Sequence, residues 1–251
     1  MKVFKLSTKI FFFPIYYFIH NNFIFGLLHK LFVKKFFYKN IKINLNIKDI
    51  PTQNYSSFLF KTYEYNDRKL VEKHIDKKNK CIIVGGGLGF IAALSFQNSK
   101  NDILIFEINK NIIENLISNL EQNHVKYNLY QKNLILDLSH DQKKIYYVDK
   151  YFLNNSMYLK SDKETILENI TKDQIPNFDL FNTIIIDGEG IEEYFIKNIS
   201  LMKNIEYIIF ELHYNIFSNE EVIELFNILK KNSFAQIDKC FNSYYFKKIT
   251  A

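Results

Sequence analysis

A cluster of glycines behind a short apolar run constrains the fold of this chain more than any other feature. Only seven glycines occur in 251 residues, and four of them lie in the segment 85–89 (Gly-Gly-Gly-Leu-Gly). The apolar run 81–84 before it is typical of a buried strand. Glycine is favoured where the backbone must adopt a positive φ or approach a ligand closely. We therefore expect a tight turn, followed by a helix that begins near Phe90 and points its first N–H groups at a ligand.

Strands and helices alternate along the rest of the chain. Apolar runs predict strands at residues 81–84, 102–106, 127–136, 145–148, 183–186, 207–212, 235–239 and 244–249. Helical spacing predicts helices at residues 90–98, 110–122, 191–203 and 219–231. The charged stretch 160–178 is expected to be irregular. This order predicts an α/β fold with a doubly wound, mostly parallel, Rossmann-like sheet.

The first part of the chain has a different composition from the rest. Residues 1–48 contain nine lysines and no acidic residue, so 24 basic and 27 acidic residues remain for the other positions. We expect a basic, aromatic N-terminal segment (residues 1–62) and a main domain (residues 63–251). Within them we expect extended structure at residues 41–47 and 58–65, and a helix from Asn66, as its N-cap, to about Ile75.

The basic segment leaves three interpretations open. Its apolar run 10–19 contains Pro14 and is shorter than the roughly 20 residues that a spanning helix needs. Residues 1–40 therefore form a helical appendage, lie at the surface of an anionic membrane, or span it. The main domain has a net charge of −3 (24 basic minus 27 acidic residues), which argues against nucleic acid as a partner.

The cysteines indicate the compartment. Cys81 and Cys240 both lie in apolar runs and are expected to be buried thiols in a reducing environment. We therefore expect a cytoplasmic protein, with the option of a peripheral position on the inner face of a membrane.

Polar chemistry is concentrated at three predicted strand ends. The first strand ends in the glycine turn, the second in Glu107, and a later one in the segment 187–190 (Asp-Gly-Glu-Gly). Six of the seven glycines therefore lie at two strand ends. Ligands of open α/β sheets bind beyond the carboxyl ends of the strands, so we expect one site here. Glu107 can accept two hydrogen bonds from a ribose, or it can favour a helix N-terminus.

The glycine spacing narrows the class of ligand. A dinucleotide fingerprint (G-x-G-x-x-G) would require glycine where Phe90 stands, and no lysine-serine pair completes a phosphate loop. The G-x-G-x-G spacing favours a nucleoside with a charged tail that lacks phosphate. A nicotinamide-dependent oxidoreductase is the alternative that Phe90 disfavours.

These motifs together resemble the FkbM-type family of S-adenosylmethionine-dependent methyltransferases. The resemblance rests on the glycine turn, Glu107, the segment 187–192 and the strand segment 209–213 (Ile-Phe-Glu-Leu-His), and it extends from about Tyr63 to Ile249. It implies a class I methyltransferase fold with an antiparallel final strand. It also implies transfer of a methyl group from S-adenosyl-L-methionine to a hydroxyl, often on a sugar or polyketide, and we expect a saccharide or glycan precursor.

The resemblance also assigns cofactor-binding residues. Gly85, Gly87, Leu88 and Gly89 would line the methionine part of the cofactor, and Glu107 would hold its ribose. Such methyltransferases usually carry an acid two residues before the first glycine, where this chain has Ile83. A non-catalytic Rossmann-like domain recruited to a membrane surface is the alternative.

Three residues are candidates for catalysis. Asp187, Glu189 and His213 all follow predicted strands on the cofactor side, with Asp187 expected beside the cofactor's methyl group. Methyl transfer to an alcohol requires in-line positioning and an acceptor for the hydroxyl proton. His213 suits that role, since an unperturbed histidine has a pKa of about 6.5. A structural strand-end histidine and a helix N-terminal glutamate are the alternatives, and no tight ligand spacing predicts a metal.

Overall fold

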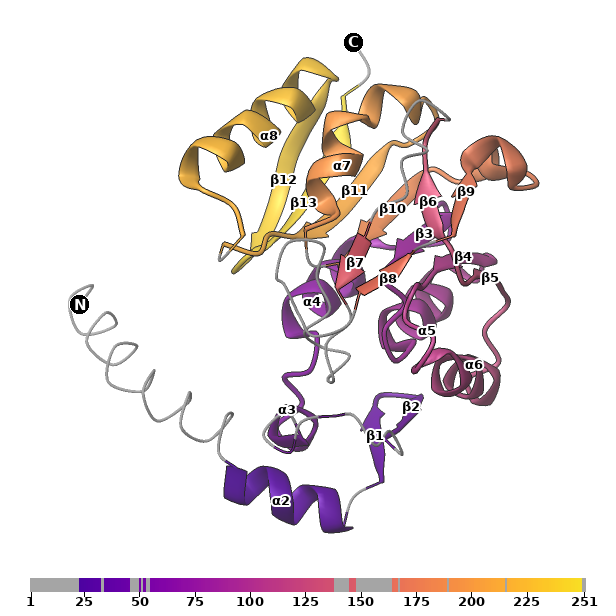
Figure 1. Ribbon diagram of the computed structural model, residues 1–251, viewed down its shortest axis with the longest axis vertical. Coiled ribbons are helices and arrows are strands. Elements are labelled where there is room, and N and C mark those ends of the chain that lie inside the picture. Colours follow the sequence, from indigo (N-terminus) through magenta and orange to yellow (C-terminus); the bar gives the residue numbers. More distant parts are fainter. Residues whose placement is uncertain are drawn as a thin grey trace, which may run out of the picture.

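The computed structural model (Figure 1) describes most of the chain downstream of residue 22. The described residues are 23–32, 34–45, 50, 52, 55–137, 145–147, 164–166, 168–188, 190–214 and 216–249. Residues 1–22 of the basic segment and the catalytic candidate Glu189 lie outside this set.

A seven-stranded sheet forms the centre of the molecule, in the order β12-β13-β11-β10-β3-β4-β5. Its strands are β3 (Cys81–Val84), β4 (Ile103–Phe106), β5 (Tyr127–Tyr130), β10 (Thr183–Ile186), β11 (Tyr207–Glu211), β12 (Phe234–Cys240) and β13 (Ser243–Lys248). The neighbours from β11 to β5 are parallel, whereas β13 runs antiparallel to both β11 and β12. The predicted α/β fold with an antiparallel final strand is confirmed.

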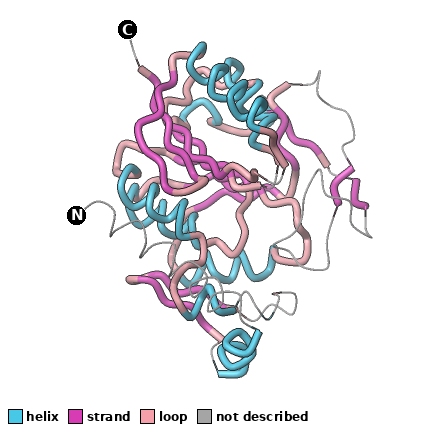
Figure 2. Tube along the Cα trace, turned by 90° about the vertical axis from the view of Figure 1, so that its left-hand side faces the viewer, coloured by secondary structure: helices cyan, strands magenta, loops and turns pink. Residues whose placement is uncertain are grey.

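The central strands are apolar on both faces because each face is covered. In β3, Cys81 and Ile83 belong to one hydrophobic core, while Ile82 and Val84 belong to the other. Alternate side chains of a strand point to opposite faces, so a continuous apolar run is what a doubly covered strand requires. Figure 2 shows helices on both sides of the sheet.

Helices connect the strands and cover the two faces. They are α4 (Tyr65–His74), α5 (Phe90–Ser99), α6 (Ile113–Gln122), α7 (Glu192–Lys197) and α8 (Asn219–Lys231). Buried residues of α4, α5 and α6 belong to the first core, and those of α7 and α8 to the second. The ends of α8 match the prediction, and Ser218 and Glu221 form a capping box at its start.

Short elements fill the region between β5 and β10. They are β6 (Asn133–Ile135), β7 (Ile145–Tyr147), β8 (Glu164–Ile166), β9 (Asn169–Thr171), and the 3-10 turns η4 (Lys172–Gln174) and η5 (Phe178–Leu180). The prediction that residues 160–178 are irregular is therefore wrong for β8, β9 and η4, whereas β6 and β7 lie in predicted strands. Pairs β6·β9 and β7·β8 bring together strands far apart in sequence, which local periodicity does not reveal. The predicted helix 191–203 is also divided, into α7 and η6 (Ile199–Leu201).

The described N-terminal elements are α2 (Phe23–Phe32), the hairpin β1 (Lys35–Tyr38) and β2 (Ile41–Asn44), and α3 (Tyr55–Leu59). The hairpin and α3 pack on the first core, and α2 packs on α3. Phe36 of the hairpin lies 5.4 Å from Phe90, centroid to centroid, and the Lys42 N–H donates to Asn123 Oδ1 at 2.9 Å. The hairpin thus shares a core with α5 and α6, and the division at residue 62 stays a prediction.

Two predictions for the approach to α4 are wrong. Residues 58–65 are not extended: α3 ends at Leu59 and a turn leads to α4. Tyr63 and Phe58 pack against each other in the core with tilted rings (4.5 Å between centroids), so tertiary packing overrides their strand propensity. The N-cap is Glu64, in left-handed conformation (φ 46°, ψ 38°), and not Asn66, which lies in the first turn.

Membrane contact remains a prediction. Among the described residues, no helix is both long and apolar enough to cross a bilayer. The first 22 residues of the basic, aromatic segment lie outside them.

Candidate active site

The glycine turn after β3 touches the end of β10. Gly85 has a φ of +91°, and a Cβ at this position would lie 1.9 Å from the main-chain oxygen of Asp187. Its own N–H donates to the carbonyl of Phe106 at 2.9 Å, at the end of β4. Only glycine allows this close approach. The two glycine-containing strand ends that the sequence singles out therefore meet at one edge of the sheet.

Glu107 holds the glycine turn in place. Its Oε2 accepts a hydrogen bond from the Gly87 N–H at 2.9 Å, and its Oε1 accepts one from the Asn109 N–H at 2.8 Å. Burial raises the pKa of Glu107, while these backbone N–H groups oppose the rise. A carboxylate has about four acceptor positions, so it can bind further hydroxyl groups. The helix α6 begins only at Ile113, so the contact is with the turn and not with a helix N-terminus.

Leu88 contributes packing to the turn. Its side chain has no exposed surface and lies in the first core, and its carbonyl accepts a hydrogen bond from Asn119 Nδ2 at 2.9 Å. The side chain of Leu88 is therefore part of the core, and only its backbone is available to the predicted cofactor site. Gly89 begins α5 as its N-cap, in left-handed conformation.

Glu64 lies over the glycine turn and was not predicted from the sequence. A Cβ placed on Gly87 would lie 3.5 Å from Glu64 Oε1 and 3.7 Å from the Tyr63 hydroxyl. Glu64 Oε2 is buried and has no hydrogen-bond partner among the described residues. Burial, together with the nearby charge of Glu211, raises the pKa of Glu64 to about 7, although hydrogen bonding to Tyr63 opposes this. A left-handed non-glycine residue with an unpaired buried oxygen is a strained arrangement that functional sites retain.

Three further carboxylates gather at the same edge. Asp67 lies on α4, Asp187 follows β10, and Glu211 ends β11. The pKa values of Asp67 and Asp187 are raised well above the ordinary value, mainly by burial and then by the neighbouring acids. No lysine or arginine in the described part of the chain forms an ion pair with these three acids or with Glu64. The edge is therefore an environment that favours positively charged ligands.

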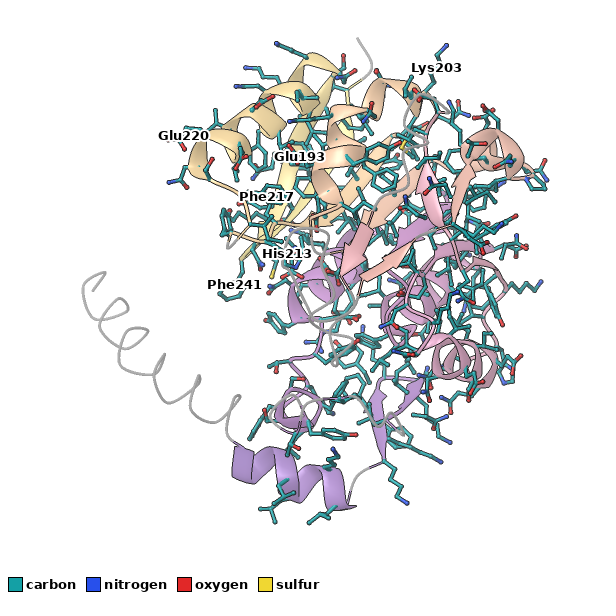
Figure 3. All side chains as sticks on the ribbon, in the orientation of Figure 1. Glu193, Lys203, His213, Phe217, Glu220 and Phe241 are labelled. Atoms are coloured by element: carbon teal, nitrogen blue, oxygen red, sulfur yellow. The ribbon has the colours of Figure 1, made fainter. Side chains whose placement is uncertain are left out.

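His213 is paired with a buried glutamate. Its Nδ1 lies 3.1 Å from Glu192 Oε1, and Glu192 Oε2 accepts a hydrogen bond from the Gly190 N–H at 2.7 Å. Glu192 is completely buried, so its charge is directed at the imidazole and at the turn after β10. A carboxylate that holds one ring nitrogen orients the imidazole and supports its protonated form. Figure 3 shows His213 and Phe241 at the same end of the molecule's central sheet, away from Lys203.

One ligand atom from each of Asp187, Glu211 and His213 lies within 4.8 Å of the other two. Of the sequence-based candidates, the structure thus brings together Asp187 and His213, while Glu189 lies outside the described residues. The sequence contained a signal for Glu211, because it stands two residues before His213 at a predicted strand end. It contained none for Glu64, the N-cap of α4, or for Asp67 on that helix, which both precede the glycine turn.

The strand order and the antiparallel C-terminal hairpin define a class I methyltransferase fold of the Rossmann-like type. Solved structures similar to this chain include a methyltransferase from Pyrococcus furiosus (13% identity, TM-score 0.48, 88% of this chain and 95% of that one). They also include P. horikoshii TYW2 in complex with MeSAdo (11% identity, TM-score 0.47, 84% of this chain and 68% of that one). A third is the ribosomal protein L11 methylase from Lactobacillus delbrueckii subsp. bulgaricus (14% identity, TM-score 0.44, 73% of this chain and 77% of that one).

No protein-family model matches the sequence, and no curated protein matches it either, so the FkbM-type family is not identified in this way. The identities are low and the TM-scores are below 0.5. The fold is therefore defined by the strand order, and the evidence for function lies in the site residues.

Proposed function

We propose that this protein is an S-adenosylmethionine-dependent O-methyltransferase of the FkbM type, which methylates a hydroxyl of a saccharide or glycan precursor. The observation that carries the proposal is the edge of the sheet where Gly85 meets Asp187 and Glu107 binds the Gly87 N–H. The saccharide class of acceptor rests on the resemblance of the sequence to that family.

The residues at this edge fit the cofactor. Glu107, buried and with acceptor capacity left, would hold the ribose hydroxyls, and Gly85 and Gly87 would lie along the methionine part. Glu64 would bind the ammonium group, because its buried Oε2 has no partner among the described residues. It would replace the acid that related methyltransferases carry where this chain has the buried Ile83. When bound, S-adenosylmethionine supplies an electrophilic methyl group on a sulfonium centre.

The chain's own residues would position the acceptor and take its proton. The acceptor hydroxyl would lose its proton when it takes up the methyl group, and that proton would pass to a base of the chain. His213 is that base, because Glu192 orients its ring and favours the imidazolium that forms. Asp187, whose raised pKa favours the protonated carboxyl, would donate a hydrogen bond at the reacting centre. Most of the rate enhancement is expected from positioning.

Product analysis tests the proposed reaction. The protein is incubated with S-adenosylmethionine and a panel of glycosides, S-adenosylhomocysteine release is measured, and methylated glycosides are identified by mass spectrometry. We expect acceptor-dependent release that falls at least about 100-fold in His213→Ala, as for the loss of a general base. His124→Ala, which removes an exposed histidine at the end of α6, should retain full activity. Release with no O-methylated product in any glycoside would contradict the proposal.

We also propose that the N-terminal segment contacts an anionic membrane surface from the cytoplasmic side. In α2, Leu28 and Leu31 have exposed fractions of 50% and 63%, and Lys34 follows the helix, exposed. Exposed leucines beside lysines are typical of helices that lie at an anionic lipid surface. The contact is independent of catalysis, since α2 lies apart from the strand-end site in Figure 1.

A further inference from the structure

We propose that Asp187, Glu211 and His213 form a binding site for one divalent metal cation. The three residues lie at the ends of neighbouring parallel strands. Ile186 of β10 is paired with Phe210 of β11, so the next residues, Asp187 and Glu211, emerge side by side. His213 follows two positions later. One ligand atom from each lies within 4.8 Å of the others.

That spacing is compatible with shared coordination. Protein oxygen and nitrogen ligands lie about 2.0–2.4 Å from a divalent ion, so two ligands of one ion are separated by up to about 4.8 Å. The three atoms already lie within that limit. Because Asp187 and Glu211 stand at the ends of paired strands, side-chain rotation alone would adjust them to an ion.

Neighbouring side chains already orient two of the three ligands. Asn242, in the turn between β12 and β13, donates from Nδ2 to Glu211 Oε1 at 2.6 Å, and Asn66 Nδ2 donates to Asn242 Oδ1 at 2.7 Å. Glu192 holds His213 through Nδ1. Metal-binding histidines and carboxylates usually have such outer partners, which fix the direction of the ligand atom.

An unpaired acid behind the cluster indicates that positive charge belongs there. Asp67 is only 2% exposed, and its Oδ1 accepts no hydrogen bond from any described residue. Its charged neighbours are Glu211, Glu64 and His213. Buried anions are costly unless a cation or several hydrogen bonds compensate them. A divalent ion between Glu211 and Asp187 would supply that compensation.

The ligand set selects the class of metal. Two carboxylate oxygens and one imidazole nitrogen suit Mn²⁺ or Zn²⁺ better than Mg²⁺ or Ca²⁺, which prefer oxygen ligands alone. The site is distinct from Glu107 and the Gly87 turn, where the cofactor is placed. If the proposed methyl transfer is correct, on which this role rests, the ion would bind the acceptor hydroxyl and lower its pKa. In that metal-bound state Asp187 and His213 would be ligands, so the hydroxyl proton would pass to solvent and not to His213.

Manganese titration tests the site without involving catalysis. MnCl2 is added to the full-length protein, previously freed of metals with a chelator, in the absence of S-adenosylmethionine. Free Mn²⁺ is measured by electron paramagnetic resonance, and Zn²⁺ and Mg²⁺ are tested as competitors. We expect one bound ion per chain, displaced by Zn²⁺ more readily than by Mg²⁺. Glu211→Gln and Asp187→Asn should each weaken binding at least tenfold.

Glu206→Gln is the matched control, because it removes an exposed carboxylate just before β11, at the opposite end of that strand. It should leave Mn²⁺ binding unchanged. Thermal melting with chelator checks that Glu211→Gln is folded, which we expect because it removes one charge from an acidic cluster. If that variant does not fold, Asp187→Asn decides the question from the neighbouring strand.

No stoichiometric Mn²⁺ binding, or equal binding in the folded ligand variants, would overturn the inference. A calorimetric titration of the same samples with S-adenosylmethionine separates the two proposals. Cofactor binding without Mn²⁺ binding removes only the metal site. Mn²⁺ binding without cofactor binding removes the methyltransferase proposal and leaves the metal site standing.

Discussion

Glu64→Gln should stabilise the unliganded protein at neutral and higher pH but not near pH 4. The pKa of Glu64 rises from 4.5 to about 7 in the folded chain. Between these values the folded state binds more protons than the unfolded state, so the free energy of unfolding falls as the pH rises. One pKa unit corresponds to about 1.4 kcal/mol, which sets an upper limit of roughly 3 kcal/mol. Because Glu64 is partly exposed, we expect a gain of about 1–2 kcal/mol near pH 8 and none near pH 4.

The charges that face Glu64 come from three elements. They are Asp67 on α4, Asp187 after β10 and Glu211 on β11, and all are acids whose ionisation adds to the effect. Urea denaturation should therefore be followed at several pH values with a chelator present, so that no metal ion neutralises the cluster. The variant and the wild type are compared at each pH. To first order, this comparison cancels the titration of the groups that both proteins contain.

Glu72→Gln is the control on the same helix. Burial alone would raise the pKa of Glu72, but hydrogen bonds from Lys39 and Tyr38 bring it below the ordinary value. Its charge therefore stabilises the fold above the unfolded pKa, and the contribution is lost as the pH falls. Glu72→Gln should destabilise the protein near pH 8, opposite in sign to Glu64→Gln. If Glu64→Gln were neutral or destabilising near pH 8, or equally stabilising near pH 4, the account of this carboxylate would be refuted.

Two other predictions concern the glycine turn and the N-terminal helix. Gly85→Ala should cost at least about 3 kcal/mol of unfolding free energy, since it combines a positive φ with a Cβ 1.9 Å from the Asp187 carbonyl. Gly87→Ala should cost only about 1 kcal/mol by urea denaturation, and equal losses would contradict the geometry. In sedimentation with anionic vesicles, Leu28→Gln/Leu31→Gln should reduce low-salt binding of the full chain. Binding that persists unchanged in this variant, or at high salt, would show that α2 and its lysines are not the contact.

Much of the sheet could be predicted from the sequence because its central strands are buried on both faces. The runs around Ile83, Ile105, Ile185 and Ile209 are continuous and apolar, and glycine or acidic residues end them. The glycine turns and acidic residues at these ends can be recognised from the sequence alone, without knowledge of the tertiary structure. The antiparallel final strand was expected only through the resemblance to a family.

Elements stabilised by distant contacts could not be predicted. The hairpin strand β1 forms because Phe36 packs against Phe90 and Tyr63. No local periodicity in the sequence indicates these two distant partners. Similarly, the aromatic run before α4 has strand propensity but becomes a helix and a turn, because its rings enter a core formed by later residues. Pairing of β6 with β9 has the same cause.

The site residues also divide into those that the sequence alone indicates and those that depend on distant contacts. Gly85, Glu107, Asp187 and His213 are visible in the sequence because they stand at the ends of strands, where the fold class places ligands. Glu64 is not visible, because its place beside Gly87 depends on the packing of segments far apart in the sequence. In the proposed function, Glu64 would supply the carboxylate for the cationic cofactor in a chain that has Ile83 where the family it resembles carries an acid.

Calorimetric titration with S-adenosylmethionine tests the central claim most directly. We predict that the wild-type protein binds one equivalent, and that Glu107→Gln weakens binding at least about tenfold, as for the loss of charge-assisted hydrogen bonds to the ribose. Glu206→Gln, with its exposed carboxylate at the other end of the sheet, should bind like the wild type. Thermal melting confirms that each variant is folded. No binding to the folded wild-type protein at high micromolar cofactor, or equal binding by Glu107→Gln, would contradict the account.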